Sequence, residues 1–322
     1  MLVIWSIVNF IQGPASFIDV LLIGLTNGAV YGLIALGYTL VYGILQLINF
    51  AHANVFALSG LVSSTMLTSV LGLTVADSTI VTLAGVGVTL LVAVAFGAAL
   101  NTSIELVAYR RLRHAPRLAP LITAVGMSFI LQNVGLYFWG VDYESIPNLI
   151  PQTDVFSIGG VDYQWNKLTV ILITIPLLLF LTWLVNSTRQ GKAMRATSQD
   201  PEAAAMMGIN VNRTISFTFA LAGGLAGAAG VLYLLNFTVV RYDQGFQLGL
   251  IAFTAAVIGG IGNLAGAVLG AVIIGMIEAF NEGLTWMTPG SDWTRSMVFG
   301  LLIAILVFRP EGLLGERTPE GA

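Results

Sequence analysis

The stretch TIVTLAGVGVTLLVAVAFGAALNTSI, residues 79–104, contains no charged side chain. A helix needs about 20 apolar residues to cross roughly 30 Å of bilayer hydrocarbon, and this stretch supplies that length. Similar runs recur along the chain, so that 57% of the residues are hydrophobic, 9% are charged and the mean hydropathy is +0.89. Soluble globular domains do not reach such values. Because membrane-spanning strands would be short and alternating, the sequence predicts an all-α integral membrane protein.

We predict a polytopic helical bundle of about 8–10 transmembrane helices, with nine preferred, and a single transmembrane domain over residues 1–322. The seventh segment is short for a full crossing and ends in Gly-Gly-Ile-Gly-Asn at residues 259–263. This ending favours a half-helix that turns inside the protein. The predicted spans are residues 18–43, 48–71, 79–104, 118–139, 168–185, 215–235, 249–262, 264–281 and 295–308.

Ten of the thirteen basic residues gather in three polar segments, which the positive-inside rule places in the cytoplasm. They are Arg110, Arg111, Arg113, Arg117, Arg189, Lys192, Arg195, Arg213, Arg309 and Arg317. The loop 140–167 carries four acidic residues against a single lysine and is expected to be periplasmic. With nine crossings the N-terminus lies outside and the C-terminus in the cytoplasm. An even number of crossings would move the N-terminus inside.

A short pattern occurs twice: Gly-Leu-Ile-Ala precedes Asn-x-Ala-x-Ala at Asn49 and again at Asn263. Such matches arise easily by chance in a chain rich in glycine, alanine and leucine, so an internal repeat stays an open question. At both places an asparagine stands between two apolar helices, where it could cap the second. Paired broken helices are typical of a transporter's substrate site, because their N-termini offer free N–H groups to an anion such as a carboxylate.

The residues around these breaks form the predicted substrate pathway: Tyr38, Asn49, His52, Asn54 and Asn263. Two simpler interpretations remain open. The two capping asparagines could lie at the membrane surface, and a lone histidine near a helix start is more often a packing residue than a ligand. Asn54 adds polarity beside His52, which makes the group more notable than any one member.

The chain carries no nucleotide-binding motif, since the segment 191–193 (Gly-Lys-Ala) lacks the upstream glycine and the hydroxyl of a P-loop. No hydrolase motif and no metal site are recognised, so an enzyme is not expected. The acidic residues of the spans lie at or near span ends, where their side chains can reach water: Asp19, Asp77, Glu105 and Glu278. A proton- or sodium-coupled carrier usually keeps a charge at the centre of the hydrocarbon. Driven transport would therefore need a separate ATPase.

The cytoplasmic loop 186–214, NSTRQGKAMRATSQDPEAAAMMGINVNRT, interrupts the apolar chain with a predicted soluble helix. Glu202 would lie in the first turn of this helix, and Gly208 would end it. Ala203 and Ala204 would let a partner approach closely. The pattern Glu-Ala-Ala, three residues, then Gly resembles the core of the motif by which membrane subunits of ABC importers bind their ATPase.

The chain as a whole resembles the permease subunits of branched-chain amino-acid ABC importers. The similar segments occur in the family's order and cover most of the chain: residues 24–60 (GLTNGAVYGLIALGYTLVYGILQLINFAHANVFALSG), 195–211 (RATSQDPEAAAMMGINV), 252–280 (AFTAAVIGGIGNLAGAVLGAVIIGMIEAF) and 309–315 (RPEGLLG). Many relatives have His-Gly-Glu where this chain has His-Ala-Asn at residues 52–54, so one carboxylate is missing here.

This resemblance implies an assembly in the inner (plasma) membrane. Two permeases, identical or related, would join two ATP-binding-cassette ATPases and a periplasmic binding protein that delivers Leu, Ile or Val. Docking of the ATPase would fall to Glu202, Ala203, Ala204 and Gly208, as the coupling helix of the permease. The permease itself would hold no cofactor, because ATP binds the partner subunit, and no nucleic-acid partner is expected.

The substrate is less defined, because similar permeases also carry urea and short amides. A zwitterion or small amide suits a path with few charges, whereas a strongly cationic substrate would require acidic residues that the path lacks. We therefore predict import of branched-chain or other neutral amino acids by alternating access, with urea or a short amide as the alternative. A passive facilitator of small neutral solutes and a membrane scaffold without transport are the remaining alternatives.

Overall fold

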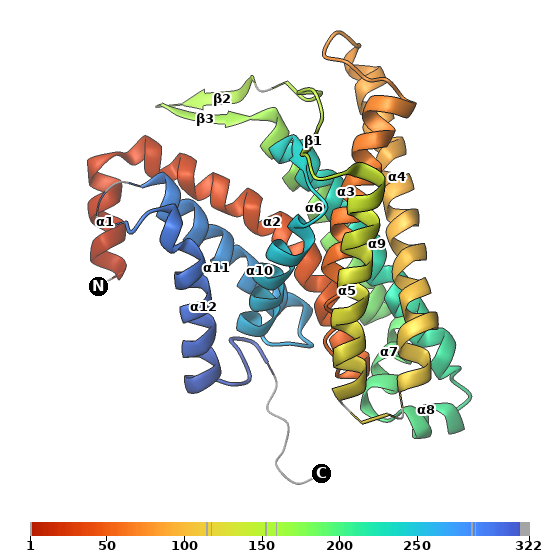
Figure 1. Cartoon of the computed structure of the whole chain (residues 1–322). Coiled ribbons are helices and arrows are strands. Elements are labelled where there is room, and N and C mark those ends of the chain that lie inside the picture. The colour runs from red at the N-terminus through yellow and green to blue at the C-terminus, as the bar shows by residue number, and fades with distance from the viewer. Residues whose placement is uncertain are drawn as a thin grey trace.

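The computed structural model describes residues 2–113, 115–116, 118–151, 153–158, 160–284, 286 and 288–315. It is a polytopic helical bundle, which confirms the predicted fold class (Figure 1). Eight helices of this part of the chain are long and apolar enough to cross a membrane. They are α2 (Pro14–Leu45), α3 with the π-helical turn η1 (His52–Val70), α4 with the turns η2 and η3 (Thr79–Leu112), α5 (Leu118–Trp139), α6 (Trp165–Ser187), α9 (Val211–Phe237), α11 (Leu264–Gly283) and α12 (Ser291–Phe308).

The seventh predicted span is the short apolar helix α10, Gln244–Gly259, of 16 residues. It ends where the backbone turns at Gly260 and Gly262, whose φ angles are +105° and +97°. Only glycine adopts such angles without strain. α11 then begins at Leu264, so the expected shortened helix before a turn is confirmed.

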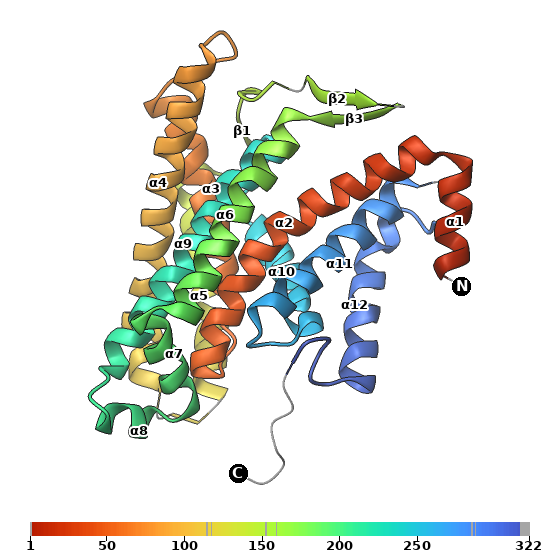
Figure 2. The same ribbon diagram turned by 180° about the vertical axis from the view of Figure 1, so that it is seen from behind.

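Successive apolar helices reverse direction along the chain, so the connecting segments gather at two opposite ends of the bundle (Figures 1 and 2). The three predicted cytoplasmic segments all lie at one end. Of their ten basic residues, Arg117 and Arg317 fall outside the described residues, and the other eight belong to these segments. The predicted periplasmic loop lies at the opposite end.

That loop contains the hairpin of β2 (Asp154–Ile158) and β3 (Val161–Gln164). A second small pairing joins β1 (Glu144–Ser145) to β4 (Val239–Val240), which follows α9. A 2.9 Å hydrogen bond between the Tyr163 and Thr26 hydroxyls also ties the loop to α2. Among the described residues, the strands are confined to this end of the molecule.

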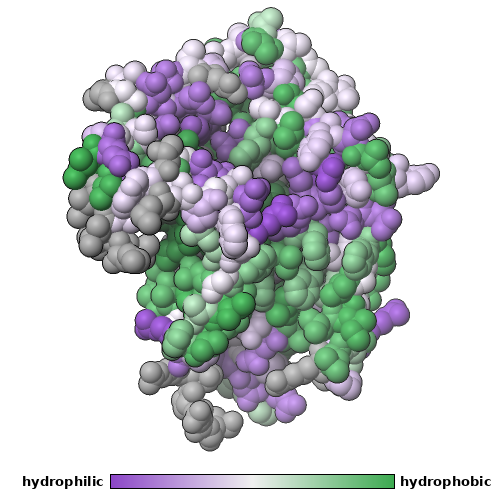
Figure 3. Space-filling view, turned by 60° about the vertical axis from the view of Figure 1, so that its left-hand side comes forward, coloured by the Kyte–Doolittle hydropathy of each residue, from purple (hydrophilic) through white to green (hydrophobic). Residues whose placement is uncertain are grey.

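Glycines allow the central helices to touch backbone to backbone. A Cβ added to Gly223 in α9 would lie 2.2 Å from the Gly97 carbonyl oxygen in α4, and one on Gly275 in α11 would lie 2.4 Å from the Gly28 nitrogen in α2. Small residues at helix crossings are the usual means by which membrane helices associate. The outer helices turn apolar side chains outward, and Figure 3 shows an apolar band between two polar zones.

A short helix α1, Leu2–Gln12, precedes this bundle and packs beside the end of α11. The Trp5 indole N–H donates a 3.0 Å hydrogen bond to the Trp286 carbonyl, and the Trp5 and Phe280 rings meet edge to face. The start of the described chain is therefore fixed to the loop that joins α11 to α12.

Candidate functional site

The predicted cytoplasmic loop folds into two helices where one was predicted: α7 (Arg189–Gln199) and α8 (Pro201–Met206). Asp200 separates them and caps α8, since its carboxylate accepts 2.9 Å hydrogen bonds from the Glu202 and Ala203 N–H groups. Gly208 follows the end of α8 with a φ of +85°. The predicted helix with Glu202 in its first turn and a glycine beyond its end is therefore confirmed.

α8 is largely exposed at the edge of the bundle (Figure 1). Of the predicted docking residues, Glu202 and Gly208 are exposed and Ala203 is half-buried, whereas Ala204 is buried against its own chain. The two neighbouring methionines were not predicted: Met206 and Met207 are 83% and 82% exposed. Such flexible thioether side chains adapt readily to an apolar partner surface.

α7 is anchored to the end of α6. The Thr188 hydroxyl accepts a 3.1 Å hydrogen bond from Gly191 N–H and caps α7. Arg195 donates to the Val185 and Asn186 carbonyls, which are left free where α6 ends. The start of the loop is therefore held against the end of α6.

A buried ionic cluster ties the end of α4 to the start of α9 beside this loop. Glu105 is fully buried and accepts hydrogen bonds from Arg110, Arg113 and the Ser216 hydroxyl. Arg113 also donates to Asn212. Burial lowers the pKa of the Arg113 guanidinium, and the adjacent Glu105 carboxylate offsets part of that shift. The expectation that Glu105 reaches water from a span end is wrong, because two π- and 3₁₀-helical turns fold its arginines back over it.

Asn49 does not cap a helix, which corrects the prediction. The N-cap position of α3 is Ala51, and Asn49 instead accepts a 3.1 Å hydrogen bond from the Ala51 N–H. Its side chain also accepts 2.9 Å from the Tyr109 hydroxyl and donates 3.2 Å to Asn101, so it joins the break after α2 to α4. With 1% of its surface exposed, Asn49 is buried between these helices.

Tyr38 and His52 meet where α2 and α3 pack against α10. The Tyr38 and His52 rings are 5.0 Å apart, and both residues are buried. Neither His52 ring nitrogen reaches hydrogen-bond geometry with another described residue. The Asn54 amide donates to the Ser128 carbonyl and hydroxyl at 2.9 and 2.6 Å, which fastens α3 to α5. This cluster is a packed junction.

Asn263 caps α11 as predicted, since its side chain accepts a 2.9 Å hydrogen bond from Gly266 N–H. It also donates 2.8 Å to the Leu314 carbonyl. The Leu313 and Leu314 N–H groups in turn bind the Ile258 and Gly259 carbonyls at the end of α10. We call this tail segment, residues 309–315, the latch. Asn263 therefore fastens the latch at one end of the bundle.

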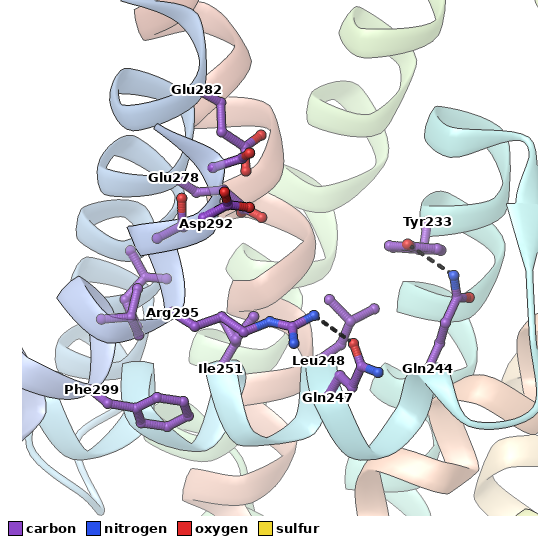
Figure 4. Close-up of a pocket in the computed structure, with 14 residues that line it drawn as sticks. Tyr233, Gln244, Gln247, Leu248, Ile251, Glu278, Glu282, Asp292, Arg295 and Phe299 are labelled. Carbon is purple, nitrogen blue, oxygen red and sulfur yellow. Dashed lines mark hydrogen bonds between the residues drawn. The ribbon is translucent and has the colours of Figure 1, made fainter. Parts of the chain in front are cut away.

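Of the five predicted pathway residues, Tyr38 borders a small space of about 10 Å³ between α2 and α10. A much larger cavity of about 490 Å³ opens between α9, α10, α11 and α12 (Figure 4). Its lining residues are Tyr233, Gln244, Gln247, Leu248, Ile251, Ile274, Glu278, Glu282, Ser291, Asp292, Thr294, Arg295, Val298 and Phe299.

This cavity was not predicted from the sequence. The available signal was a set of polar pairs at helical spacing: Gln244 with Gln247 on α10, Glu278 with Glu282 on α11, and Asp292 with Arg295 on α12. Residues three or four apart share one helix face. Each pair alone resembles an ordinary helix end, and the fold is needed to bring the three faces together.

Residues 20–307 match the family model described as the permease component of the branched-chain amino acid transport system. The chain belongs to this family. The high-affinity branched-chain amino acid transport system permease protein BraD of Pseudomonas aeruginosa is 38% identical over 307 residues, which cover 94% of this chain and 97% of BraD. The corresponding protein LivH of Escherichia coli is 35% identical over 310 residues, with the same shares covered.

A more distant relative, the fructose import permease protein FrcC of Rhizobium meliloti, is 28% identical over 200 residues, which cover 59% of this chain and 54% of FrcC. The chain is therefore a multi-pass membrane permease with the transport role of its family. The predicted resemblance is confirmed along nearly its whole length.

Proposed function

We propose that this permease moves branched-chain or other neutral amino acids into the cytoplasm as the membrane subunit of an ATP-driven importer. The observation that carries the proposal is α8, an exposed helix capped by Asp200 at the end of the bundle where the basic segments gather. Full-length similarity to BraD and LivH favours amino acids over urea as the substrate.

The exposed face of α8 is the proposed docking site for an ATP-binding-cassette ATPase. Glu202, Ala203 and Gly208 would meet the ATPase together with the two methionines, Met206 and Met207. Ala204 would support the docking site indirectly, because its buried side chain packs α8 against the rest of the permease. In the proposed orientation, α8 and the latch would lie in the cytoplasm, the loop 140–167 in the periplasm and the N-terminus outside.

The assembly would contain two permeases, identical or related, two ATPases and a periplasmic binding protein. ATP binding would close the ATPases and draw the α8 helices together, and the anchored α7 would pass this movement to α6. The permease pair would then take substrate from the docked binding protein and release it inward after hydrolysis. Such alternating access needs only weak substrate binding in the permease.

Gly208→Trp tests the docking site. The assembled importer should lose uptake while its ATPase activity continues, because the bulky side chain would stand in the contact. Gly140→Trp is the matched control: both glycines have a φ near +80° (+85° and +80°) and open space around them, but Gly140 lies at the opposite end. Normal uptake by Gly208→Trp, or equal loss in both variants, would show that α8 does not couple the ATPase.

Reconstitution in liposomes separates the wider alternatives. The importer predicts leucine uptake that requires ATP and co-purification of a P-loop ATPase from native membranes. Uptake by the permease alone without ATP would indicate a passive facilitator, and no flux under any condition would indicate a scaffold. Competition between leucine and urea for uptake would decide between the two substrate classes.

A further inference from the structure

The cavity of about 490 Å³ between α9 and α12 carries groups of both charges on different helices. We propose that it binds the zwitterion of an α-amino acid, with its acidic side chains on the ammonium group and Arg295 on the carboxylate. This inference rests on the proposed function, because a permease that moves amino acids must hold them on the way.

Three carboxylates converge on one side of the cavity. Glu278 and Glu282 lie one turn apart on α11, Asp292 lies in the first turn of α12, and Figure 4 shows the three side chains directed toward one another. Glu278 accepts a 2.6 Å hydrogen bond from the Tyr31 hydroxyl, which fixes its position. None of the three has a salt-bridge partner among the described residues.

Gathered carboxylates repel one another unless a cation lies between them. A substrate ammonium group supplies that cation and offers three N–H donors to the carboxylate oxygens. Urea carries no charge and would leave the repulsion in place. These three acidic residues are separated along the chain, and the fold brings them together at the cavity.

Arg295 supplies the complementary group. It lies three residues after Asp292 on the same face of α12, and Figure 4 shows its guanidinium in the cavity. One nitrogen donates 2.8 Å to the Gln247 side-chain oxygen, which holds the guanidinium in place. A guanidinium has five N–H donors, so others remain for a bidentate bond to a carboxylate. The ammonium and carboxylate of an α-amino acid are bonded to the same carbon. This spacing suits Asp292 and Arg295, which lie about one helical turn apart on α12.

Another part of the lining is apolar and suits an aliphatic side chain. Leu248 and Ile251 on α10 face Ile274 on α11, with Val298 and Phe299 on α12. Ligand cavities in proteins commonly measure roughly 300–1,000 Å³, and this volume accommodates one amino acid with water. The cavity is built from the first turns of α10 and α12 and the last turns of α11, so it lies opposite α8, where a periplasmic binding protein would deliver its cargo.

The absence of cysteine from the sequence permits a direct test in the whole importer. Ser291→Cys places a thiol in the cavity lining, and Ser78→Cys places one on an exposed loop at the same end of the bundle. Each is labelled with 2-aminoethyl or 2-sulfonatoethyl methanethiosulfonate. At each thiol, the labelling rate with the cationic reagent is divided by the rate with the anionic reagent. We expect this ratio to be about tenfold higher at Ser291→Cys than at Ser78→Cys, because the carboxylates concentrate cations.

Leucine should slow labelling at Ser291→Cys and leave Ser78→Cys unaffected, whereas urea should protect neither. Adding Glu278→Gln should reduce the preference for the cationic reagent, and adding Arg295→Gln should abolish protection by leucine without reducing that preference. Equal reagent preference at both thiols, protection by urea, or unchanged leucine protection in Arg295→Gln would overturn the proposal. So would a Ser291→Cys thiol that neither reagent reaches in the assembled importer.

Failure of the proposed function has a different signature. If the importer takes up leucine with ATP but leucine does not protect Ser291→Cys, only the cavity assignment fails. If the unmodified importer takes up no leucine, the proposed function fails whatever the labelling shows.

Discussion

Replacing Glu105 by glutamine should destabilise the permease by about 3 kcal/mol. Glu105 is fully buried and its partner Arg113 is only 12% exposed, so this pair is shielded from water. Arg110 is 39% exposed and contributes little. Breaking a buried pair costs roughly 3–5 kcal/mol because one charge is left without compensation, and the lower value applies here since Arg113 keeps its bond to Asn212. That cost is roughly a 150-fold change in the folding equilibrium.

Heating the detergent-solubilised permease and measuring the remaining folded fraction by size-exclusion chromatography gives the Tm. Glu105→Gln should lower it by about 5 °C or more. Asp154→Asn, which neutralises an exposed carboxylate on β2, is the control and should leave the Tm unchanged. The double variant Glu105→Gln, Arg113→Gln should recover part of the loss, because it leaves no unpaired buried charge. If Glu105→Gln has the same Tm as the control, or if the double variant loses as much Tm as its two single changes added together, the cluster does not stabilise the fold.

Two further predictions concern glycines. Gly312→Ala should loosen the latch, because its Cβ would lie 2.5 Å from the Gly260 nitrogen. Endoproteinase Glu-C should then cleave the latch faster. Gly140→Ala, with a matching φ of +80° in open space, should not change cleavage. Gly223→Val should cost about 1–3 kcal/mol or more by forcing α4 and α9 apart, and the yield of monodisperse protein should fall, whereas Gly126→Val, with no atom within 4 Å of its Cβ, should be tolerated.

Features that depend on nearby residues were predictable from the sequence. The apolar runs gave the spans, including the short seventh helix, because helix length and hydrophobicity are local properties. Asn263 was correctly placed at an N-cap, since a cap joins residues three positions apart. The helix with Glu202 in its first turn followed from local rules as well.

Features that depend on distant partners were not predictable. Asn49 looked like a second cap, but its side-chain partners Asn101 and Tyr109 lie 52 and 60 residues away. The contacts of Glu105 with its arginines need two irregular turns that hydropathy does not reveal. The large cavity requires four helices to converge, so its charged pairs looked like ordinary helix ends.

The latch also constrains how the C-terminal third of the permease can move. Because Leu313 and Leu314 bind the last carbonyls of α10, the chain from Ile258 to Leu314 is closed by hydrogen bonds into a ring that contains α11 and α12. A closed ring resists sliding of one helix past the next but can tilt as a unit. The cavity lies at one end of these helices and the latch at the other. A tilt of the helices that widens the cavity would therefore narrow the space beside the latch.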